Sequence, residues 1–298
     1  MAHVLAVDVG GTFIKSAVID TEAIGTGALA HVQRSSTTIG TDNGHSLIKQ
    51  IVGIAQSSDV EVKAVGVVTP GVIDEEHGII KYATNLKIRE LALRDELEET
   101  LQIPVNLGHD GRAAALAEHL VGAGQVFNNF AFMPIGTGIS VGLIIDGQVR
   151  KSDGLIGEIG HANVGHNELC GCRMTGCLEA IASTSAIARR FEARTGKSTT
   201  SEEVFHLSQS GNADAQVIWQ DAINGIAFAA DWLMNTLAPE AIVIGGGLSR
   251  AGQSLLDDVD AKLSQRLSFQ RKPQLLLAQL GDDAGCLGAA LLAKGRLA

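Results

Sequence analysis

Two similar apolar patterns, about 125 residues apart, occur in the chain. Residues 3–20 contain an apolar run, a Gly-Gly-Thr turn and a second apolar run that ends at an acidic residue. Residues 130–147 repeat this order around a Gly-Thr-Gly turn. Each segment has the pattern of a β-hairpin. Hairpins are common enough for coincidence, but the matched turns predict an internal duplication with two lobes, each beginning with a hairpin.

Elsewhere, apolar runs of strand length alternate with stretches that have helical spacing. The predicted strands are 62–68, 104–107, 241–244 and 274–278. The predicted helices are 46–57, 88–101, 111–121, 178–194, 215–237 and 284–294, and 195–203 is expected to be a surface loop. This alternation of strands and helices predicts an α/β fold built in layers.

The composition narrows the class of protein. With 298 residues, 45% of them hydrophobic and 19% charged, the chain is long enough for two folded domains. A net charge of −10 argues against a nucleic-acid partner, which needs a basic face. No apolar run approaches the length of a membrane span, and the N-terminal run before Asp8 is too short for a signal peptide. We therefore expect a cytoplasmic protein without a membrane partner.

One imidazole and three thiols lie close together in the second half of the chain: His161, Cys170, Cys172 and Cys177. Glycines between them permit tight turns, and Cys₃His is a common tetrahedral ligand set for Zn²⁺. One alternative is a cluster of small buried cysteines. A disulfide is the weaker alternative, because Cys170 and Cys172 are too close to bridge comfortably and no signal peptide precedes them. The pattern favours a structural zinc site.

Three glycine turns each follow an apolar strand. The first comprises Gly10, Gly11 and Thr12, the second Gly136, Thr137 and Gly138, and the third Gly245, Gly246 and Gly247. Backbone N–H groups in such turns can bind phosphate oxygens, although glycine turns also occur as ordinary connections. None of the three fits the G-x-G-x-x-G pattern of a dinucleotide site. Together they favour a mononucleotide such as ATP.

Two charged side chains accompany the first turn. Asp8 precedes it on the strand, and its carboxylate suits a hydrated Mg²⁺ rather than a phosphate. Lys15 lies three residues after Thr12, although on a strand its side chain could point elsewhere. We therefore group Asp8 and Lys15 with the candidate ATP-binding residues.

Asp110 stands where a predicted strand ends and the Ala-rich helix begins. On local grounds it could be a helix-capping residue. It could also be a general base that orients a sugar hydroxyl and accepts its proton during phosphoryl transfer. The two roles are compatible.

The ordered motifs resemble those of the ROK sugar kinases (repressor, open reading frame, kinase) over nearly the full chain. The matching segments are Asp-x-Gly-Gly-Thr at 8–12, Thr-Pro-Gly-Val at 69–72, Thr-Asn-Leu at 84–86, Asp110 with the alanines at 113–114, Gly-Thr-Gly at 136–138, Gly-Glu-Ile-Gly-His at 157–161, and the Cys-x-Cys-x₄-Cys-Leu-Glu run. The zinc run in this order is the most specific of them.

The resemblance implies a two-lobed actin/hexokinase-like fold, an RNase H-like duplication with an active-site cleft between the lobes. The N-terminal lobe would be 1–120, joined by the C-terminal helix 284–298, and the other lobe 121–283. The expected ligands are ATP with Mg²⁺, a small sugar and a structural Zn²⁺, and the expected assembly is a homodimer.

The resemblance also implies roles for individual residues. Asp110 would be the catalytic base. The sugar-binding residues would be Gly71, Asn85, His109, Asp110, Glu158, His161 and Glu179. The zinc ligands would be His161, Cys170, Cys172 and Cys177, with His166 as a competing ligand in the same loop. Zinc would lock the loop that carries the acidic and imidazole groups of the sugar site.

The chain departs from the family pattern in three places. Where the family usually has Asn-Asp-x-Asn, this chain has His109, Asp110, Gly111 and Arg112. Replacement of the first Asn, which normally bonds a sugar hydroxyl, leaves the choice of sugar open. Arg112 is expected to pair with a nearby carboxylate. The loop between His161 and Cys170 also lacks the usual Asp-Pro pair.

The leading hypothesis is an ATP-dependent kinase for the 6-hydroxyl of a hexose or an N-acetylhexosamine, with glucose as the default and N-acetylmannosamine and N-acetylglucosamine close behind. A sugar-responsive transcriptional regulator of the same family is one alternative, opposed by the acidic charge balance and by the position of Asp-x-Gly-Gly-Thr at residue 8. A sugar sensor without catalytic activity is the other.

Overall fold

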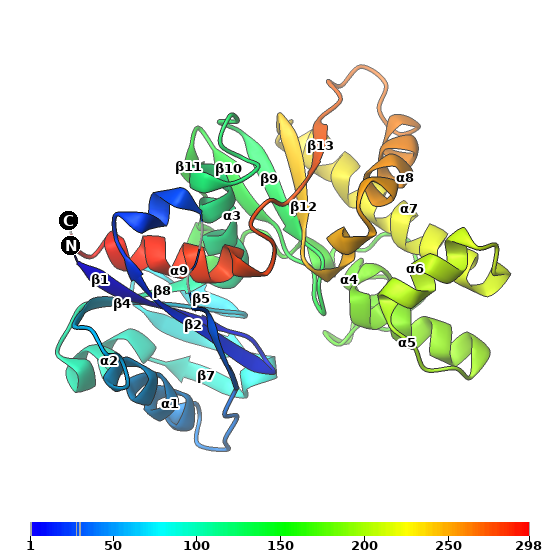
Figure 1. Ribbon diagram of the computed structural model, residues 1–298. Coiled ribbons are helices and arrows are strands. Elements are labelled where there is room, and N and C mark those ends of the chain that lie inside the picture. The colour runs from blue at the N-terminus through cyan, green and yellow to red at the C-terminus, as the bar shows by residue number, and fades with distance from the viewer. Residues whose placement is uncertain (1, 28, 30, 298) are drawn as a thin grey trace. The chain divides into compact units, whose positions relative to one another are not determined.

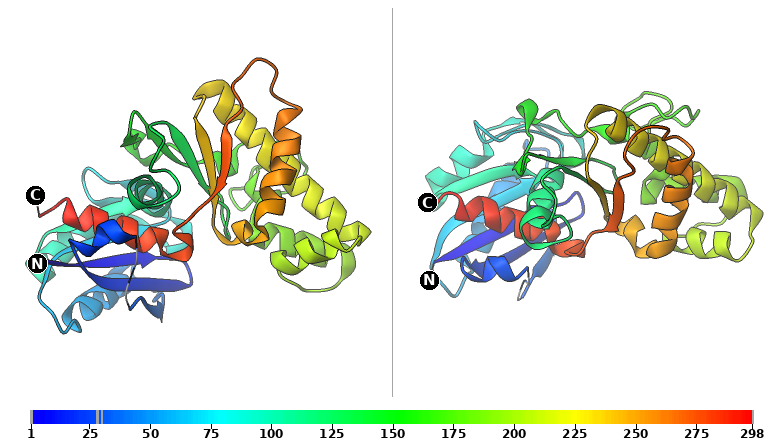
Figure 2. Two further views of the ribbon diagram at one scale, coloured as in Figure 1. Left: turned by 45° about the horizontal axis from the view of Figure 1, so that its top comes forward. Right: turned by 90° about the horizontal axis from the view of Figure 1, so that it is seen from above.

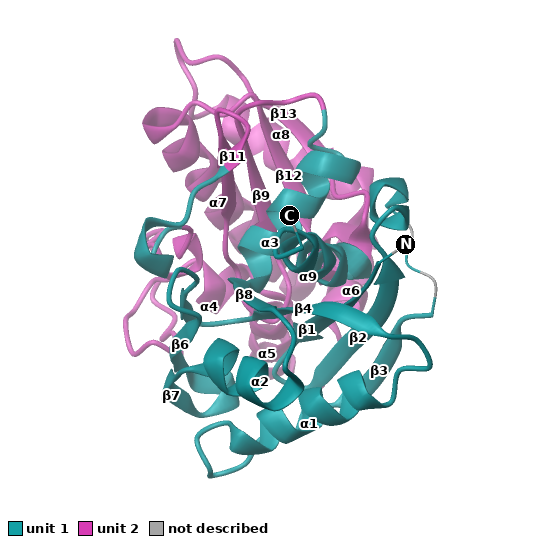
Figure 3. Cartoon of the chain, turned by 90° about the vertical axis from the view of Figure 1, so that its left-hand side faces the viewer, with its two compact units in different colours: residues 1–125, 149–156, 282–298 teal, residues 126–148, 157–281 magenta. Residues whose placement is uncertain are grey.

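The chain forms two compact units, each with its own five-stranded sheet (Figures 1 and 3). The computed structural model describes residues 2–27, 29 and 31–297. The first unit comprises residues 1–125, 149–156 and 282–298, and the second comprises 126–148 and 157–281. Residues 149–156 thus lie in the first unit, although the pattern of the sequence had not separated them from the segments around them.

The sheet of the first unit has the strand order β3-β2-β1-β4-β8. Its strands are β1 (His3–Val9), β2 (Phe13–Asp20), β3 (Gln33–Ser36), β4 (Val62–Thr69) and β8 (Val105–His109). β1 is antiparallel to β2 and parallel to β4, which is parallel to β8. The N-terminal hairpin and the strand at 62–68 are therefore as predicted, and the strand predicted over 104–107 is β8.

Helices cover both faces of this sheet. Because side chains alternate along a strand, Leu5, Val7 and Val9 of β1 pack with α1 (His45–Gln56) and α2 (Leu93–Leu101). Val4 and Ala6 face the opposite core, with α9 (Ala284–Lys294) and part of α3 (Asp110–Val121). Figure 2 shows α9 lying along the sheet beside α3. Burial on both faces explains the continuous apolar run of β1.

A small antiparallel sheet, β5-β6-β7, corrects one prediction. Its strands are β5 (Val72–Asp74), β6 (Ile79–Ala83) and β7 (Ile88–Leu91). The helix predicted over 88–101 therefore begins only at Leu93. Ile88 and Leu91 are both buried at a spacing of three, which imitates a helix. The cause is Glu90, whose positive φ of 49° interrupts the alternation of the strand.

The second unit repeats the plan of the first. Its sheet has the order β11-β10-β9-β12-β13, with strands β9 (Phe130–Pro134), β10 (Gly142–Ile145), β11 (Gln148–Val149), β12 (Ala241–Gly245) and β13 (Gln274–Leu277). β9 is antiparallel to β10 and parallel to β12, which is parallel to β13. Strand order and direction match those of the first sheet, so the predicted duplication is confirmed.

The helix predicted over 178–194 is two helices, α4 (Glu179–Ala182) and α5 (Thr184–Thr195). Ser183 between them is extended, and its hydroxyl accepts a hydrogen bond from Ala186 N as the N-cap of α5. The apolar spacing continues across the break because both helices bury one face. The break could not be read from that spacing.

The surface loop predicted over 195–203 is shorter than expected. Thr200 caps a helix, α6 (Ser201–Gln209), by accepting from Glu203 N. The long helix predicted over 215–237 is α7 (Ala213–Thr236), and α8 (Gln253–Ser264) lies in a segment for which the sequence had predicted no element.

Short 3₁₀ helices complete the described chain: Ala23–Thr26, Thr84–Leu86, Ser152–Gly154, Ile159–His161, Gly247–Ala251 and Gly281–Asp283. Among the described residues, no helix combines the length and apolar character needed to span a bilayer.

Candidate active site and metal centre

In the first unit, the predicted site residues follow the carboxyl ends of three parallel strands. The Gly10–Thr12 turn follows β1, Gly71 follows β4, and Asp110 follows β8. Strand register places Asp8 beside Val68 and Thr69 beside His109. Because parallel strands end at one edge of a sheet, these residues share that edge, which is where open α/β sheets bind ligands.

The Asp8 carboxylate is largely buried and lies near both a positive and two negative side chains. Burial raises its pKa to about 6; Lys15 opposes this shift, whereas Asp110 and Asp282 add to it. Lys15 is its cross-strand neighbour, with Nζ 3.7 Å from Asp8 Oδ2 and 2.6 Å from the carbonyl oxygen of Asp282. The side chain of Lys15 therefore points toward Asp8.

The helix that carries Asp110 is capped by its neighbour. His109 is the N-cap of α3, and its Nδ1 accepts hydrogen bonds from Gly111 N at 3.1 Å and Arg112 N at 3.4 Å. Asp110 is the first helical residue, so the alternative role of Asp110 as the N-cap is wrong. Its carboxylate is 38% exposed and accepts a bond of 2.6 Å from Gly111 N. A half-exposed, oriented carboxylate is suited to accept a proton.

The hydrogen bonds of His109 define its tautomer. Because Nδ1 accepts from two backbone amides, the proton of the neutral ring is on Nε2. The 3.3 Å approach of Nδ1 to Asp110 Oδ1 is therefore not an ion pair in this state. His109 is buried, with 6% of its surface exposed.

Gly71 and Asn85 lie near the same edge. Gly71 has a φ of 114°, and a Cβ there would lie 2.3 Å from the Tyr82 carbonyl oxygen, so only glycine fits. Asn85 is in the 3₁₀ helix Thr84–Leu86, and its Cβ is 3.4 Å from the position of a Cβ built on Gly11. The structure thus brings the sugar candidate Asn85 against the first glycine turn.

The two glycine turns of the second unit adjoin each other through Ile135. Ile135 N donates to the Gly245 carbonyl, and Leu248 N donates to the Ile135 carbonyl. Gly246 has a φ of 74°, and a Cβ there would lie 2.6 Å from Ile135. The turns follow β9 and β12, which are parallel neighbours. Three predicted glycine positions, Gly245–Gly247, therefore lie beside the Gly136–Gly138 turn.

The Gly136–Gly138 turn is anchored to helices α4 and α5. Thr184 N donates to the Gly136 carbonyl at 2.8 Å, and Ser185 Oγ donates to the Thr137 carbonyl at 2.9 Å. Glu179, the first residue of α4, accepts from Ile139 N at 2.9 Å through Oε2. A Cβ on Gly138 would lie 2.8 Å from that same oxygen. The Glu179 carboxylate thus packs against the turn at a point where only a glycine leaves room for it.

A pocket of about 210 Å³ opens beside this turn, within the second unit. Its polar lining includes Thr137, Glu179, Ser183, Ser185 and Arg189. Glu158 precedes the 3₁₀ helix Ile159–His161 and is half-buried, and its carboxylate has no hydrogen-bond partner among the described residues. Glu158 and Glu179 are therefore both available to accept from a ligand.

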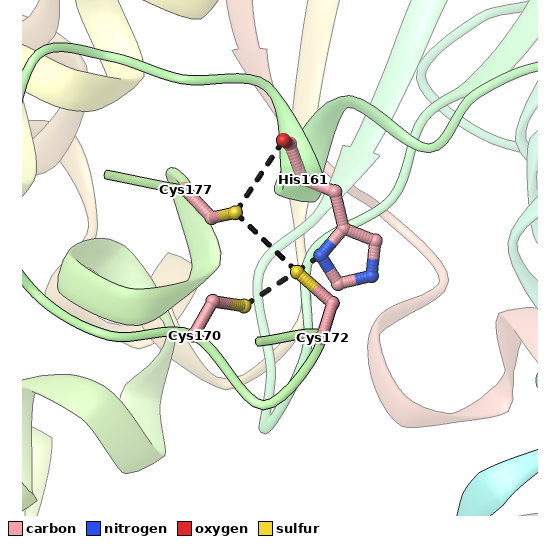
Figure 4. A group of neighbouring side chains, drawn as sticks. All are labelled: His161, Cys170, Cys172 and Cys177. Atoms are coloured by element: carbon pink, nitrogen blue, oxygen red, sulfur yellow. Dashed lines mark hydrogen bonds between the residues drawn. The ribbon is translucent and has the colours of Figure 1, made fainter. Parts of the chain in front are cut away.

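The four predicted zinc ligands converge (Figure 4). The candidate ligand atoms of His161, Cys170, Cys172 and Cys177 all lie within 4.8 Å of one another. Cys172 Sγ and Cys177 Sγ are 3.6 Å apart, and Cys170 Sγ is 3.7 Å from His161 Nδ1. A tetrahedral site with Zn–S bonds of about 2.3 Å has edges of about 3.8 Å. The separation of the sulfurs fits a metal and is too long for the disulfide alternative.

The loop that carries the thiols is a tight hairpin. Cys170 N donates to the Met174 carbonyl and Arg173 N to the Cys170 carbonyl, with Arg173 at a φ of 74°. Burial, and then the two neighbouring thiols, raise the pKa of Cys177 to about 12. A divalent cation has the opposite effect, because coordinating thiols are deprotonated. The donor set, two of whose thiols (Cys170 and Cys177) are buried, therefore fits Zn²⁺.

His166, the competing ligand, lies outside this group. Its Nδ1 accepts from Glu168 N at 3.2 Å. Its Nε2 lies 3.2 Å from Arg190 Nη2 and 3.4 Å from Asp221 Oδ2. Nδ1 is thus occupied by a backbone amide of its own loop, and Nε2 contacts side chains of α5 and α7.

Comparison with known proteins agrees with this arrangement. The model of the ROK family matches residues 4–296. The chain belongs to the ROK family. A glucokinase of Halalkalibacterium halodurans is 33% identical over 97% of this chain and 94% of the relative, and an N-acetylmannosamine kinase of Vibrio vulnificus is 34% identical over 96% of each.

The fold comparison supports the same family. A ROK glucokinase from Streptomyces griseus, solved with glucose and AMPPNP, superposes with a TM-score of 0.85 at 27% identity, covering 99% of this chain and 100% of that one. The predicted actin/hexokinase-like fold is therefore confirmed.

Glu75 is a charged residue of this ROK protein that the sequence alone did not identify. Arg112 stands where the family usually has Asn, and its predicted carboxylate partner is Glu75, at 2.7 Å from Nε to Oε1. Glu75 also lies 3.0 Å from Lys151 Nζ. Burial would raise the pKa of Glu75, but Arg112 and Lys151 outweigh it and hold that pKa below its ordinary value. No local signal marks Glu75, because its partners are distant in sequence.

Proposed function

We propose that this ROK protein is an ATP-dependent kinase that phosphorylates the 6-hydroxyl of a hexose or an N-acetylhexosamine. The placement of Asp110 carries this proposal: its half-exposed, oriented carboxylate lies at the strand-end edge that also holds Asp8 and the first glycine turn. The similar identities to a glucokinase and an N-acetylmannosamine kinase support the reaction class and keep both sugar types as candidates.

In the proposed reaction, Asp110 accepts the proton of the sugar hydroxyl while the hydroxyl oxygen attacks the γ-phosphorus of ATP. The bond from that phosphorus to the β–γ bridging oxygen breaks, and ADP leaves with the electron pair. Such a transfer requires mainly positioning and charge stabilisation, so an ionised aspartate at a helix N-terminus is sufficient as the base.

The proposed ATP-binding residues supply N–H groups and charge. They are Asp8, Gly10, Gly11, Thr12, Lys15, Gly136, Thr137, Gly138, Gly245, Gly246 and Gly247. Asp8, when ionised, would hold the hydrated Mg²⁺ that accompanies ATP and neutralises phosphate charge. The buried position of Asp8 supports this role, since a carboxylate with a raised pKa gains from a nearby cation.

The proposed sugar-binding residues are Gly71, Asn85, His109 and Asp110 in the first unit, and Glu158, His161 and Glu179 in the second. The two glutamates would accept hydrogen bonds from sugar hydroxyls. His109 can only donate, because its Nδ1 is already an acceptor for the helix cap. It would therefore require an accepting sugar oxygen, a narrower requirement than that of the amide usual in the family.

We further propose that His161, Cys170, Cys172 and Cys177 bind one structural Zn²⁺. The ion would fix the backbone on which His161 and Glu179 are carried, since Glu179 follows Cys177 by two residues. The homodimer that the resemblance implies is a separate prediction, which light scattering tests by finding twice the 31.1 kDa chain mass.

The decisive experiment is a coupled ADP-release assay with MgATP and a panel of glucose, mannose, N-acetylglucosamine and N-acetylmannosamine, followed by ³¹P NMR of the product. We expect one or more sugars to be converted to the 6-phosphate. Asp110→Asn should lower kcat by about 10²- to 10⁴-fold while calorimetry still detects sugar binding.

The matched control is Asp59→Asn, which changes an exposed aspartate away from the site and should retain full activity. Near-normal kcat in Asp110→Asn would show that the base is misassigned. Sugar binding without turnover in the wild type would favour the sensor, and sugar-dependent DNA binding would favour the regulator.

A further inference from the structure

Arg112 is a guanidinium buried in the first unit, with 2% of its surface exposed. Its Nε donates to Glu75 Oε1 at 2.7 Å, and its Nη1 is 3.4 Å from the Gly154 carbonyl oxygen. Its Nη2 has no hydrogen-bond partner among the described residues. A buried ion pair adds little net stability, and an unpaired buried N–H reduces it. Stability alone therefore does not explain an arginine at this position.

The partner of Arg112 has a second contact that bears on the helix. Glu75 Oε1, the oxygen that Arg112 binds, also accepts from the backbone N–H of His109 at 3.3 Å. His109 is the N-cap of α3, so this N–H stands at the beginning of the helix that carries Asp110. A carboxylate at a helix N-terminus is also favoured by the helix dipole.

These contacts form a capping box from two segments. In the usual box, the N-cap side chain accepts from the N–H of the third helical residue, whose acidic side chain accepts from the N-cap N–H. Here His109 accepts from Arg112 N, the third helical residue. Arginine cannot accept a hydrogen bond, so Glu75 takes that part and Arg112 holds Glu75 in place.

The residue enclosed by this box is Asp110. Its Oδ1 accepts from Gly111 N, an amide that also donates to His109 Nδ1. We propose that Arg112 and Glu75 are positioning residues for phosphoryl transfer, which complete the N-terminal cap of α3 and thereby hold the Asp110 carboxylate in its reactive orientation. This inference rests on the function proposed above.

Four variants test the inference: Arg112→Met, Arg112→Lys, Glu75→Gln and the double variant Glu75→Gln/Arg112→Met. Arg194→Met is the matched control, because Arg194 forms an exposed pair with Asp214 in the second unit. The wild type is assayed first, with MgATP and the sugar it prefers. Steady-state kinetics are then combined with amide hydrogen exchange of the peptide that spans residues 105–115.

We expect Arg112→Met to lower kcat by about 10- to 100-fold, because small misplacements of a reacting group are costly, while the sugar KM changes less than about threefold. Arg112→Lys should recover part of kcat. The exchange of the 105–115 peptide should accelerate in Arg112→Met and Glu75→Gln but not in Arg194→Met. The double variant should be no worse than the poorer single variant, because it leaves no unpaired buried charge.

Unchanged kcat in both Arg112→Met and Glu75→Gln would overturn the inference, as would a loss of activity with unaltered exchange. If Arg112→Met does not fold, Glu75→Gln and the double variant give the same readings. An inactive wild type with every sugar would instead refute the proposed function. The catalytic part of this inference would then fail with it. Faster amide exchange of the 105–115 peptide in Arg112→Met and Glu75→Gln would still show that these residues complete the cap of α3.

Discussion

Asp8 and Asp110 are two carboxylates of one sheet edge with different surroundings. Asp110 is 38% exposed and bonded to a backbone amide. The Asp8 side chain is 17% exposed, and burial raises its pKa to about 6. The more buried carboxylate is costly to ionise without a cation, whereas the half-exposed one remains accessible to a substrate hydroxyl. These environments support the separate roles proposed for them, Asp8 as a ligand of hydrated Mg²⁺ and Asp110 as the base.

The raised pKa of Asp8 predicts how stability depends on pH. From about 3.8 to about 6, the folded protein binds more protons at this site than the unfolded chain, so the contribution of Asp8 to stability falls as pH rises. Asp8→Asn cannot ionise and therefore removes this decrease in folding stability. We expect the variant to be more stable than the wild type by up to about 3 kcal/mol above pH 7, with a smaller difference at pH 5.

Urea unfolding of both proteins at pH 5, 6, 7 and 8 measures this difference, with Asp59→Asn as the control that should show no pH-dependent gain. Kinase activity of Asp8→Asn should be low at every pH. In the wild type, activity should fall as pH drops below about 6. A variant less stable than the wild type at pH 8 would contradict the assigned cause.

The zinc ligands could be predicted from the sequence, whereas the partner of Arg112 and the cap of α3 could not. The motif at 157–161 and the thiol spacing were enough to predict four side chains that the fold brings together. The partner of Arg112 was foreseen only as an unnamed carboxylate, because Glu75 is 37 positions away. The capping role of His109 was missed, since histidine is not a usual N-cap residue.

At the scale of elements, local capping and the hairpin of thiols determine where the site groups lie. Ser183 interrupts a predicted helix because α5 must begin where Thr184 N reaches the Gly136 carbonyl. That requirement comes from another part of the fold, so apolar spacing alone could not reveal it. The wrong prediction of helix at β7 has a local cause instead, because the positive φ of Glu90 gives Ile88 and Leu91 a helical spacing within a strand.

The thiol hairpin predicts a metal dependence. Cys172→Ser should lose zinc, lower the melting temperature and raise the sugar KM, because the loop with His161 and Glu179 would lose its anchor. Elemental analysis should find one zinc per wild-type chain. Chelation of the wild type should reproduce the change in KM.

Cys286→Ala is the control, because Cys286 is a buried cysteine on α9, outside the cluster. It should keep its zinc and its sugar KM. A freshly purified wild type without metal, or a Cys172→Ser variant with full zinc and unchanged KM, would refute the zinc site.

At the scale of the molecule, duplication produced two sheets of one topology, and the chain returns to the first unit at residues 149–156 and again from residue 282. The apolar patterns at 3–20 and 130–147 were sufficient to predict this repeat. The close packing of α9 on β4 was not predictable, because it depends on a glycine. A Cβ on Gly66 would lie 1.8 Å from the Ala289 carbonyl oxygen. The backbones of α9 and β4 are therefore in direct contact at this point.

Gly66→Ala should consequently destabilise the first unit by about 3 kcal/mol or more, because α9 must move away from β1 and β4. Gly53→Ala is the matched control: Gly53 lies within α1, is exposed, and has no atom within 4 Å of an added Cβ. That variant should gain about 0.5–1 kcal/mol, since alanine is the better helix former. Thermal unfolding should therefore shift in opposite directions for two identical substitutions.

The zinc content of Gly66→Ala should stay at the wild-type level, because the metal ligands belong to the second unit. Equal shifts in both variants would mean that α9 does not pack on β4 as closely as described.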